Sequence, residues 1–339
     1  KTRSYDQTML GQFDRLIADR RPGLSIETLL PDVLPAGVEA GRLTAEGAAL
    51  LDPTGALEPG IPFCPPEGDA GTGMVATNAV APRTGNVSAG TSIFAMIVLE
   101  RPLAKVHEEV DLVTTPAGDL VAMVHCNNGA SELGAWADVF GEFAAALGNP
   151  AGRDEVFEVL FKAAQSGEPD GGGLLAYNYL AGEPVTGLTE GRPLIVRTPN
   201  SRLTLANFAR TQILGVFGTL ALGMRVLAAE DVALDRMFAH GGLFRTEGVA
   251  QRLLAAAIGA PVAVGETAGE GGSWGMAVLA AYLSASTDQD LGTYLNERVF
   301  ADAELSVTEP DAQDLAGFSA YLDRYSAGLA IERAATEAI

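Results

Sequence analysis

The chain has 339 residues, 47% of them hydrophobic and 19% charged, and a formal net charge of −21 at pH 7. This length and composition suffice for a large core and two domains. The negative charge disfavours nucleic acid and anionic membranes as partners, because both are negatively charged themselves. No apolar run reaches about 18 residues, so no membrane span is predicted. Two distant cysteines, Cys64 and Cys126, are expected to be free thiols in a reducing compartment. We expect a cytoplasmic protein.

Helical signals dominate the first 83 residues. Apolar residues at helical spacing predict a helix over residues 4–20. A short helix over 44–51 can be capped by Thr44, because a Ser or Thr side chain accepts hydrogen bonds from the first turn. The turn residues 52–55 end it. A further helix is predicted over 74–80, with the Gly/Thr-rich loop of residues 68–73 at its electropositive N-terminus.

The pattern changes from helical to extended after Asn86. Strands without intervening helices are predicted at 92–99, 112–115 and 120–125, and they indicate a meander that opens a second domain. The Gly- and Pro-rich residues 166–200 are expected to be long loops. Helices are predicted at 131–147, 153–165, 201–229 (capped by Ser201), 247–258 and 272–285, and strands at 235–239 and 262–264. The tail 286–339 is expected to be peripheral.

Two small-residue turns about 20 residues apart carry the clearest chemical signal. The first, Gly-Asp-Ala-Gly-Thr-Gly at 68–73, contains the lone acid Asp69, and the second is Gly90-Thr91-Ser92. Chemistry at phosphate needs N–H groups and hydroxyls that can approach closely, which Gly, Ser and Thr supply. It also needs a carboxylate to orient or deprotonate the attacking hydroxyl. The alternatives are a turn-stabilising role for Asp69 and an ordinary turn before a strand for 90–92.

In this order, the two turns resemble the FGGY carbohydrate kinases, with xylulose kinase and its relatives nearest. The family pattern GIP…GDA…GTS is matched by Gly60-Ile61-Pro62, Gly68-Asp69-Ala70 and Gly90-Thr91-Ser92. A downstream block, GG-x-x-(K/R)-(N/S/T)…Q…G-x-PV, is matched by Gly241-Gly242-Leu243-Phe244-Arg245-Thr246, Gln251 and Gly259-Ala260-Pro261-Val262. Residues 166–200 are similar to the family segment GLL-x-x-PYL-x-GE. The matches run from about residue 24 to residue 285.

The resemblance implies an actin-like (ribonuclease H-like) α/β fold. Residues 1–83 would finish the sugar-binding lobe, and residues 84–331 would form a complete ATP-binding lobe. The implied reaction transfers the γ-phosphoryl group of ATP, with Mg²⁺, to a hydroxyl of a ketopentose such as xylulose or of a related sugar or polyol. The sugar is the expected partner, and a homodimer is compatible with the resemblance.

Site residues follow from the same resemblance. Asp69 would be the general base and, with Gly68, would contact the sugar. The terminal phosphates of ATP would lie against Gly90, Thr91 and Ser92. The α-phosphate and the adenosine would contact Gly241, Gly242, Leu243, Arg245 and Thr246.

Two departures from the family pattern favour a second hypothesis. The chain lacks the D-x-G-T-T-type hairpin that grips the γ-phosphate in these kinases, so it resembles the C-terminal portion of one. Leu243-Phe244 replaces a pair of small residues, which predicts a narrower or differently shaped nucleotide pocket. The alternative is a non-catalytic, actin-like nucleotide-binding or scaffolding module.

The three histidines are given no catalytic or metal-binding role. His125 follows an apolar strand and is expected to be a packed side chain, and His107 and His240 lack the partner spacing of metal ligands. No structural metal site is predicted. The sequence has no G-x-S-x-G elbow and no G-x-G-x-x-G turn between a strand and a helix, which disfavours a serine hydrolase and a dehydrogenase.

Overall fold

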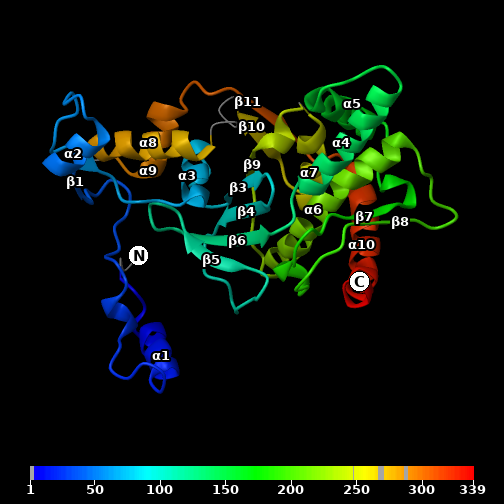
Figure 1. Cartoon of the computed structure of the whole chain (residues 1–339). Helices are drawn as coiled ribbons and strands as arrows, with labels where there is room; N and C mark the ends of the chain where they lie inside the picture. Colours follow the sequence, from blue (N-terminus) through cyan, green and yellow to red (C-terminus); the bar gives the residue numbers. More distant parts are fainter. Residues whose placement is uncertain (1–3, 247, 266–270, 286–288) are drawn as a thin grey trace.

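A mixed seven-stranded sheet lies at the centre of the computed structural model, which describes residues 4–246, 248–265, 271–285 and 289–339 (Figure 1). Its strand order is β11-β10-β9-β3-β4-β6-β5. Strand β9 pairs in parallel with β3 and β10, and the other neighbours are antiparallel. The strands are β3 (Thr84–Ala89), β4 (Ile93–Val98), β5 (Asp111–Thr114), β6 (Leu120–Cys126), β9 (Arg236–His240), β10 (Val262–Gly265) and β11 (Leu305–Thr308).

Helices cover both faces of this sheet, and the alternation of side chains along β4 shows how. Ile93, Ala95 and Ile97 pack into the larger core, whereas Met96 and Val98 pack into the smaller one. The smaller core is closed by α3 (Asp69–Ala76), α8 (Gly271–Ala285) and α9 (Leu291–Tyr294), which runs into a π-helical turn (Leu295–Val299). The larger core is closed by α4 (Ser131–Ala146), α5 (Arg153–Gln165), α6 (Leu205–Ala229) and α7 (Val249–Ile258).

Helix α6 is the central helix of the larger core, as its apolar circumference predicts. Its N-cap is Thr204, whose side chain accepts from the N–H of Asn207, and not Ser201 as expected. By length and composition alone this helix could span a membrane, contrary to the expectation of no such run. However, its most apolar stretch is 67% buried inside the protein. This burial is what a core helix requires.

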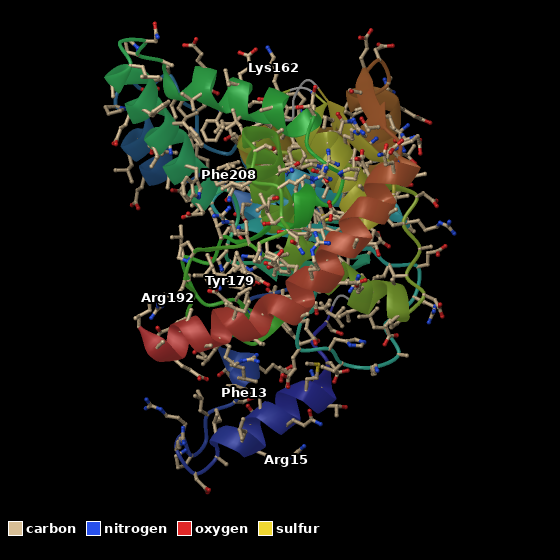
Figure 2. The ribbon with its side chains drawn as sticks, turned by 90° about the vertical axis from the view of Figure 1, so that its right-hand side faces the viewer. Phe13, Arg15, Lys162, Tyr179, Arg192 and Phe208 are labelled. Atoms are coloured by element: carbon tan, nitrogen blue, oxygen red, sulfur yellow. The ribbon has the colours of Figure 1, made fainter. Side chains whose placement is uncertain are left out.

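The expectation of a peripheral tail is wrong. Helix α10 (Ala312–Ala338) crosses one side of the molecule, and its C-terminal end lies beside Arg192 (Figure 2). Phe318, Tyr321 and Tyr325 are buried in the larger core. The buried face was not recognised because acidic residues are spread along the helix, and one of them, Asp314, is itself buried in an ion pair with Arg210.

Strand β3 was not predicted, because its sequence lacks apolar alternation. The buried Asn86 lies in its middle, and a Cβ added to Gly85 would be 2.9 Å from the carbonyl oxygen of Met96. The other strands and helices expected between residues 92 and 285 are present with bounds shifted by a few residues. The region 166–200 holds two short strands, β7 (Leu175–Tyr177) and β8 (Leu194–Val196), and 3₁₀ turns at Gly171–Gly173 and Pro184–Thr186.

The N-terminal region stands apart from the sheet (Figure 1). Helix α1 (Gln7–Ile17) has no buried residue, so the apolar side chains Met9, Phe13 and Leu16 are exposed. A 3₁₀ turn (Ile26–Thr28) and α2 (Ala45–Leu51) follow, with Thr44 capping α2 as predicted. A two-stranded ladder joins β1 (Gly41–Arg42) to β2 (Pro62–Phe63). The predicted domain division between residues 83 and 84 stays a prediction.

Candidate functional site

Two glycine-containing turns leave the sheet at the same edge. Strands β3 and β9 run in parallel, with Ser88 of β3 opposite His240 of β9. The next residues on each strand lead into Gly90-Thr91-Ser92 and Gly241-Gly242. The structure therefore brings together the two segments that the sequence analysis assigned to the phosphates and the adenosine.

The two glycines of the second turn have different structural roles. Gly241 has φ +109°, and a Cβ there would lie 2.4 Å from the carbonyl oxygen of Ala89, so only glycine fits. Gly242 opens a 3₁₀ turn (Gly242–Phe244), and a Cβ there would meet no atom within 4 Å. The nearest atom to a Cβ on Gly90 would be 4.0 Å away. Backbone at Gly90 and Gly242 is therefore free to be approached by a ligand.

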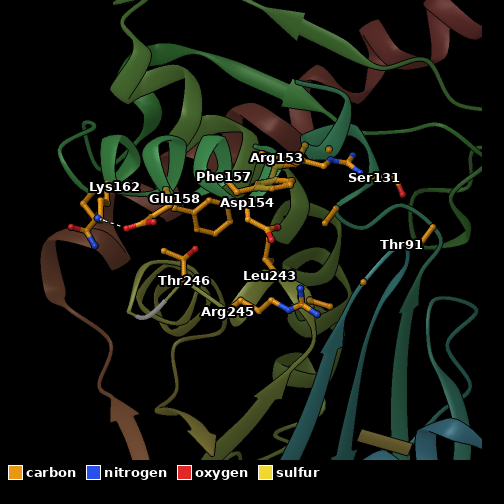
Figure 3. Close-up of a pocket in the computed structure, with 18 residues that line it drawn as sticks. Thr91, Ser131, Arg153, Asp154, Phe157, Glu158, Lys162, Leu243, Arg245 and Thr246 are labelled. Carbon is orange, nitrogen blue, oxygen red and sulfur yellow. Dashed lines mark hydrogen bonds and ion pairs between the residues drawn. The ribbon is translucent and has the colours of Figure 1, made fainter. Parts of the chain in front are cut away.

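A cavity of about 1200 Å³ lies over these turns (Figure 3). It exceeds the ~300–1000 Å³ typical of small-molecule sites. Leu243 does not close it, because that side chain is packed into the larger core. Of the predicted ATP-contacting residues, Ser92 and Gly241 are not in the wall, and the others are. The wall includes Gly90, Thr91, Gly242, Leu243, Arg245 and Thr246, Ala130 to Gly134 in part, and one face of α5.

Helix α5 supplies residues that the sequence analysis missed. Arg153, Phe157 and Lys162 line the cavity opposite Leu243 and Arg245 (Figure 3). Arg153 pairs with Asp138 at 3.1 Å and lies 5.9 Å from the centre of the Phe157 ring, and Lys162 pairs with Glu158. The helical spacing of these residues indicates a shared face, but nothing in the sequence places that face against residues 242–246.

Arg245 is the cation of the wall that is available for a ligand. Its side chain is exposed to the cavity, and among the described residues it forms no ion pair. Arginine presents several N–H donors that match the oxygens of a phosphate. Backbone N–H groups, the Thr91 hydroxyl and this guanidinium together suit a polyanionic ligand. The described residues hold no cluster of three or more His, Cys, Asp or Glu that could bind a metal ion.

Asp69 lies at the same edge but on the other face of the sheet. Near the end of α3, Thr77 accepts a hydrogen bond from the Asn86 side chain in mid-β3, at 2.8 Å. Further back, Gly73 lies beside His240 at the end of β9. Helix α3 therefore runs antiparallel to β3 and β9. Asp69 comes four residues before Gly73, so at about 1.5 Å per residue it projects about 6 Å beyond that edge. Asp69 is exposed there and is not part of the cavity wall.

The helix was expected over 74–80 but spans Asp69–Ala76, so the predicted loop at 69–73 is helical. Its glycines serve close packing. A Cβ on Gly71 would meet the Glu67 side chain at 2.5 Å, and one on Gly73 would meet His240 Nε2 at 3.3 Å. The carboxylate of Asp69 accepts the N–H of Ala70 at 2.8 Å. An acid at the first position of a helix is favourably placed in its dipole.

Behind both turns lies a buried polar pair. Asn86 Oδ1 and His240 Nε2 are buried and have no hydrogen-bond partner among the described residues. Burial lowers the pKa of His240 below its ordinary value. The imidazole is therefore neutral at pH 7.

Comparison with known proteins supports the assignment of the fold. The structure is similar to a xylulose kinase from Rhodospirillum rubrum (TM-score 0.71, 20% identity), covering 94% of this chain and 59% of that one. It is also similar to a gluconate kinase from Lactobacillus acidophilus (TM-score 0.72, 17% identity), covering 98% of this chain and 61% of that one. A third similar structure is Plasmodium falciparum glycerol kinase with ADP (TM-score 0.65, 13% identity), with coverage of 95% of this chain and 59% of that one. At these identities the likeness shows the fold, and the predicted actin-like α/β architecture is confirmed.

The chain spans about 60% of the length of these solved relatives. No match was found among curated protein sequences. The family model for the C-terminal domain of the FGGY family of carbohydrate kinases matches residues 85–284, which is more than half of the chain. This match includes both turns of the cavity and helix α5. The chain belongs to the FGGY family of carbohydrate kinases.

Proposed function

We propose that this chain is the nucleotide-binding part of an ATP-dependent carbohydrate kinase, which transfers the γ-phosphoryl group of ATP to a sugar hydroxyl. The observation that carries the proposal is the cavity over Gly90–Thr91 and Gly242, where the backbone is open to a ligand and Arg245 has no ion-pair partner among the described residues. A xylulose-like ketopentose or a related sugar or polyol is the acceptor, and Mg²⁺ accompanies ATP.

The terminal phosphates of ATP are assigned to the turn Gly90–Ser92, which lies between the cavity on one face of the sheet and Asp69 on the other. Hydrogen-bond donors aimed at developing charge are the main catalytic contribution in phosphoryl transfer. Asp69, projecting past the same edge, is assigned the role of general base toward the sugar hydroxyl. The base would then act across the turn on a sugar bound outside the cavity.

A second candidate is a non-catalytic, actin-like nucleotide-binding module. It is favoured by the position of Asp69 outside the cavity wall. The two candidates differ in what a sugar does. A kinase cleft closes on both ligands, so the sugar raises ATP affinity, whereas a scaffold binds ATP equally with and without it.

Substitution of Asp69 tests the catalytic assignment. In the enzyme translated from the whole reading frame, Asp69→Asn keeps the helical contacts but removes the base, so turnover falls by about 10²–10⁴-fold. The Kd of ATP, measured by calorimetry, stays near that of the wild type because Asp69 does not line the cavity. Turnover within about twofold of wild type would remove Asp69 from the mechanism.

A further inference from the structure

The turn Gly90–Ser92 is held in place by the segment between β6 and α4. The N–H of Gly129 donates to the carbonyl oxygen of Thr91 at 2.7 Å, and the N–H of Ala130 donates to that of Gly90 at 2.8 Å. The contact is tight, because a Cβ on Gly129 would lie 2.4 Å from the Gly90 oxygen. The position of the turn therefore depends on the two peptide groups that join residues 128, 129 and 130.

The opposite ends of the same two peptide groups are held by the side chain of Asn178. Its Nδ2 donates to the carbonyl oxygens of Asn128 at 2.9 Å and of Gly129 at 2.6 Å. The C=O and N–H of a trans peptide point in opposite directions. The side-chain amide of Asn178 therefore donates to the carbonyl oxygens of two peptide groups. The N–H groups of the same two peptides donate to the carbonyl oxygens of Thr91 and Gly90. Both partners are acceptors, which fixes the orientation of the amide.

Asn178 is well suited to hold a fixed position. It is 4% exposed and follows strand β7. Its own segment is tied to the same loop by Asn128, whose Oδ1 accepts the N–H groups of Leu180 at 2.8 Å and Ala181 at 3.0 Å. The Nδ2 of Asn128 donates to the buried carboxylate of Glu183 at 3.1 Å. The segment at 178–183 is therefore a rigid support for the loop at 128–130.

We infer that Asn178 is a positioning residue for the terminal phosphates of the nucleotide. It does not line the cavity; it sets where the Gly90–Ser92 turn presents its N–H and hydroxyl groups. The inference rests on the proposed function, which assigns the phosphates to that turn. The sequence carried a signal for it, because Asn178 stands where the pattern GLL-x-x-PYL-x-GE has proline, and proline has no amide group to donate.

The test is a series of nucleotides that differ in their number of phosphates. With Asn178→Ala, the Kd of ATP is expected to rise about tenfold, a loss of about 1.4 kcal/mol. The Kd of ADP rises less, and those of AMP and adenosine stay unchanged. Asn178→Ser keeps one donor, so its Kd for ATP is expected to lie between those of the wild type and Asn178→Ala. Equal weakening of all four ligands would show a general loosening of the domain and overturn the inference.

Two neighbouring residues provide matched controls. Asn127 donates to the carbonyl oxygen of Gly182 at 2.9 Å, joining the same two segments without contacting the peptides behind the turn. The hydroxyl of Tyr179 is bonded to Thr219 at 2.7 Å in the core. Asn127→Ala and Tyr179→Phe are expected to leave the nucleotide series unchanged, although Tyr179→Phe lowers stability by losing a buried hydrogen bond. An Asn127→Ala profile like that of Asn178→Ala would contradict the role of Asn178.

Amide hydrogen exchange in nucleotide-free protein separates this inference from the proposed function. In Asn178→Ala, exchange at Gly129 and Ala130 is expected to accelerate, and in Asn127→Ala it is not. Unchanged exchange at these amides overturns the role of Asn178 and leaves the proposed function standing. Wild-type protein that binds none of the four ligands overturns the proposed function and the role of Asn178 with it.

Discussion

At the scale of single residues, adjacent glycines in the nucleotide turn meet opposite demands. Gly241 is required by its backbone conformation and by the carbonyl of Ala89, whereas Gly242 has open space beside its Cα. The sequence motif marked both for the same role. In the structure, Gly241 shapes the turn and Gly242 leaves room for a ligand. Such a division cannot be predicted from a Gly-Gly pair, because it depends on which strand lies alongside.

Substitution of each glycine should separate the two roles. Gly242→Val places a β-branched side chain in the cavity without a clash in the protein, so the Kd of ATP is expected to rise at least tenfold while the melting temperature stays within a few degrees. Gly241→Ala strains a backbone at φ +109° and should lower the melting temperature instead. Calorimetry and thermal unfolding of both variants provide the check. Wild-type ATP affinity in Gly242→Val would mean that the turn does not contact nucleotide.

His240 gives the folded protein a dependence on pH. Its ring lies beside Gly73 on α3 and Gly271 on α8, and neither residue is charged. Burial lowers its pKa below the ordinary value of 6.5. The unfolded chain takes up a proton near pH 6.5, and the folded protein does so only at lower pH. The free energy of unfolding contributed by His240 is therefore complete above pH 6.5 and is lost as the pH falls below it.

The measurement is the change in melting temperature between about pH 7.5 and about pH 5.5, a range that spans the ordinary histidine pKa. Wild-type protein is expected to lose more stability over this range than His240→Gln, which cannot titrate. Comparing the two cancels the opposite contributions of Glu183 and Glu332, whose pKa values are raised by burial in both proteins. Equal losses would show that the His240 ring is already solvated.

At the scale of elements, α3 and α10 show where periodicity succeeds and where it fails. Helix α6 and the strands at 93–98 and 120–126 could be predicted from the spacing of apolar residues in the sequence. Helix α10 was not, because acidic residues interrupt its buried face and one of them, Asp314, is part of that face. Helix α3 was placed too late because glycines suggest a loop, whereas here Gly73 allows α3 to pack against His240, and Gly275 of α8 allows that helix to approach Thr72 of α3. Only neighbours distant in sequence decide such cases.

Two aspartates of helix α10 form ion pairs that should differ greatly in their effect on stability. Asp314 is 1% exposed and pairs with Arg210, 3% exposed, and with Arg252. Asp323 pairs at the surface with Arg225 at 3.1 Å. Asp314→Ala leaves the guanidinium of Arg210 buried and unpaired, so the free energy of unfolding should fall by about 3–5 kcal/mol. Asp323→Ala should cost less than about 1 kcal/mol. Urea titration measures both, and similar losses would refute the distinction.

At the scale of the whole molecule, the family pattern predicted more than periodicity could. The order of GIP, GDA, GTS and GG blocks identified the fold, and the structure brings the GTS and GG turns to one edge of the sheet. It did not reveal the wall formed by α5 or the support given by Asn178, because these residues contact the turns only after folding. Residues 1–339 cover about 60% of the solved relatives, and α1 exposes its apolar face. We expect this polypeptide alone to bind ATP without phosphorylating a sugar.

The most direct measurement of the central claim is transfer of radiolabelled γ-phosphate from ATP to a panel of pentuloses, hexuloses and polyols. The enzyme translated from the whole reading frame is assayed beside its Asp69→Asn variant and beside residues 1–339. A labelled sugar phosphate from the first protein and not from the other two is the predicted result. If the whole protein binds ATP tightly but labels no sugar on the panel, and its ATP affinity ignores every sugar, the chain is part of a nucleotide-binding module and not of a carbohydrate kinase.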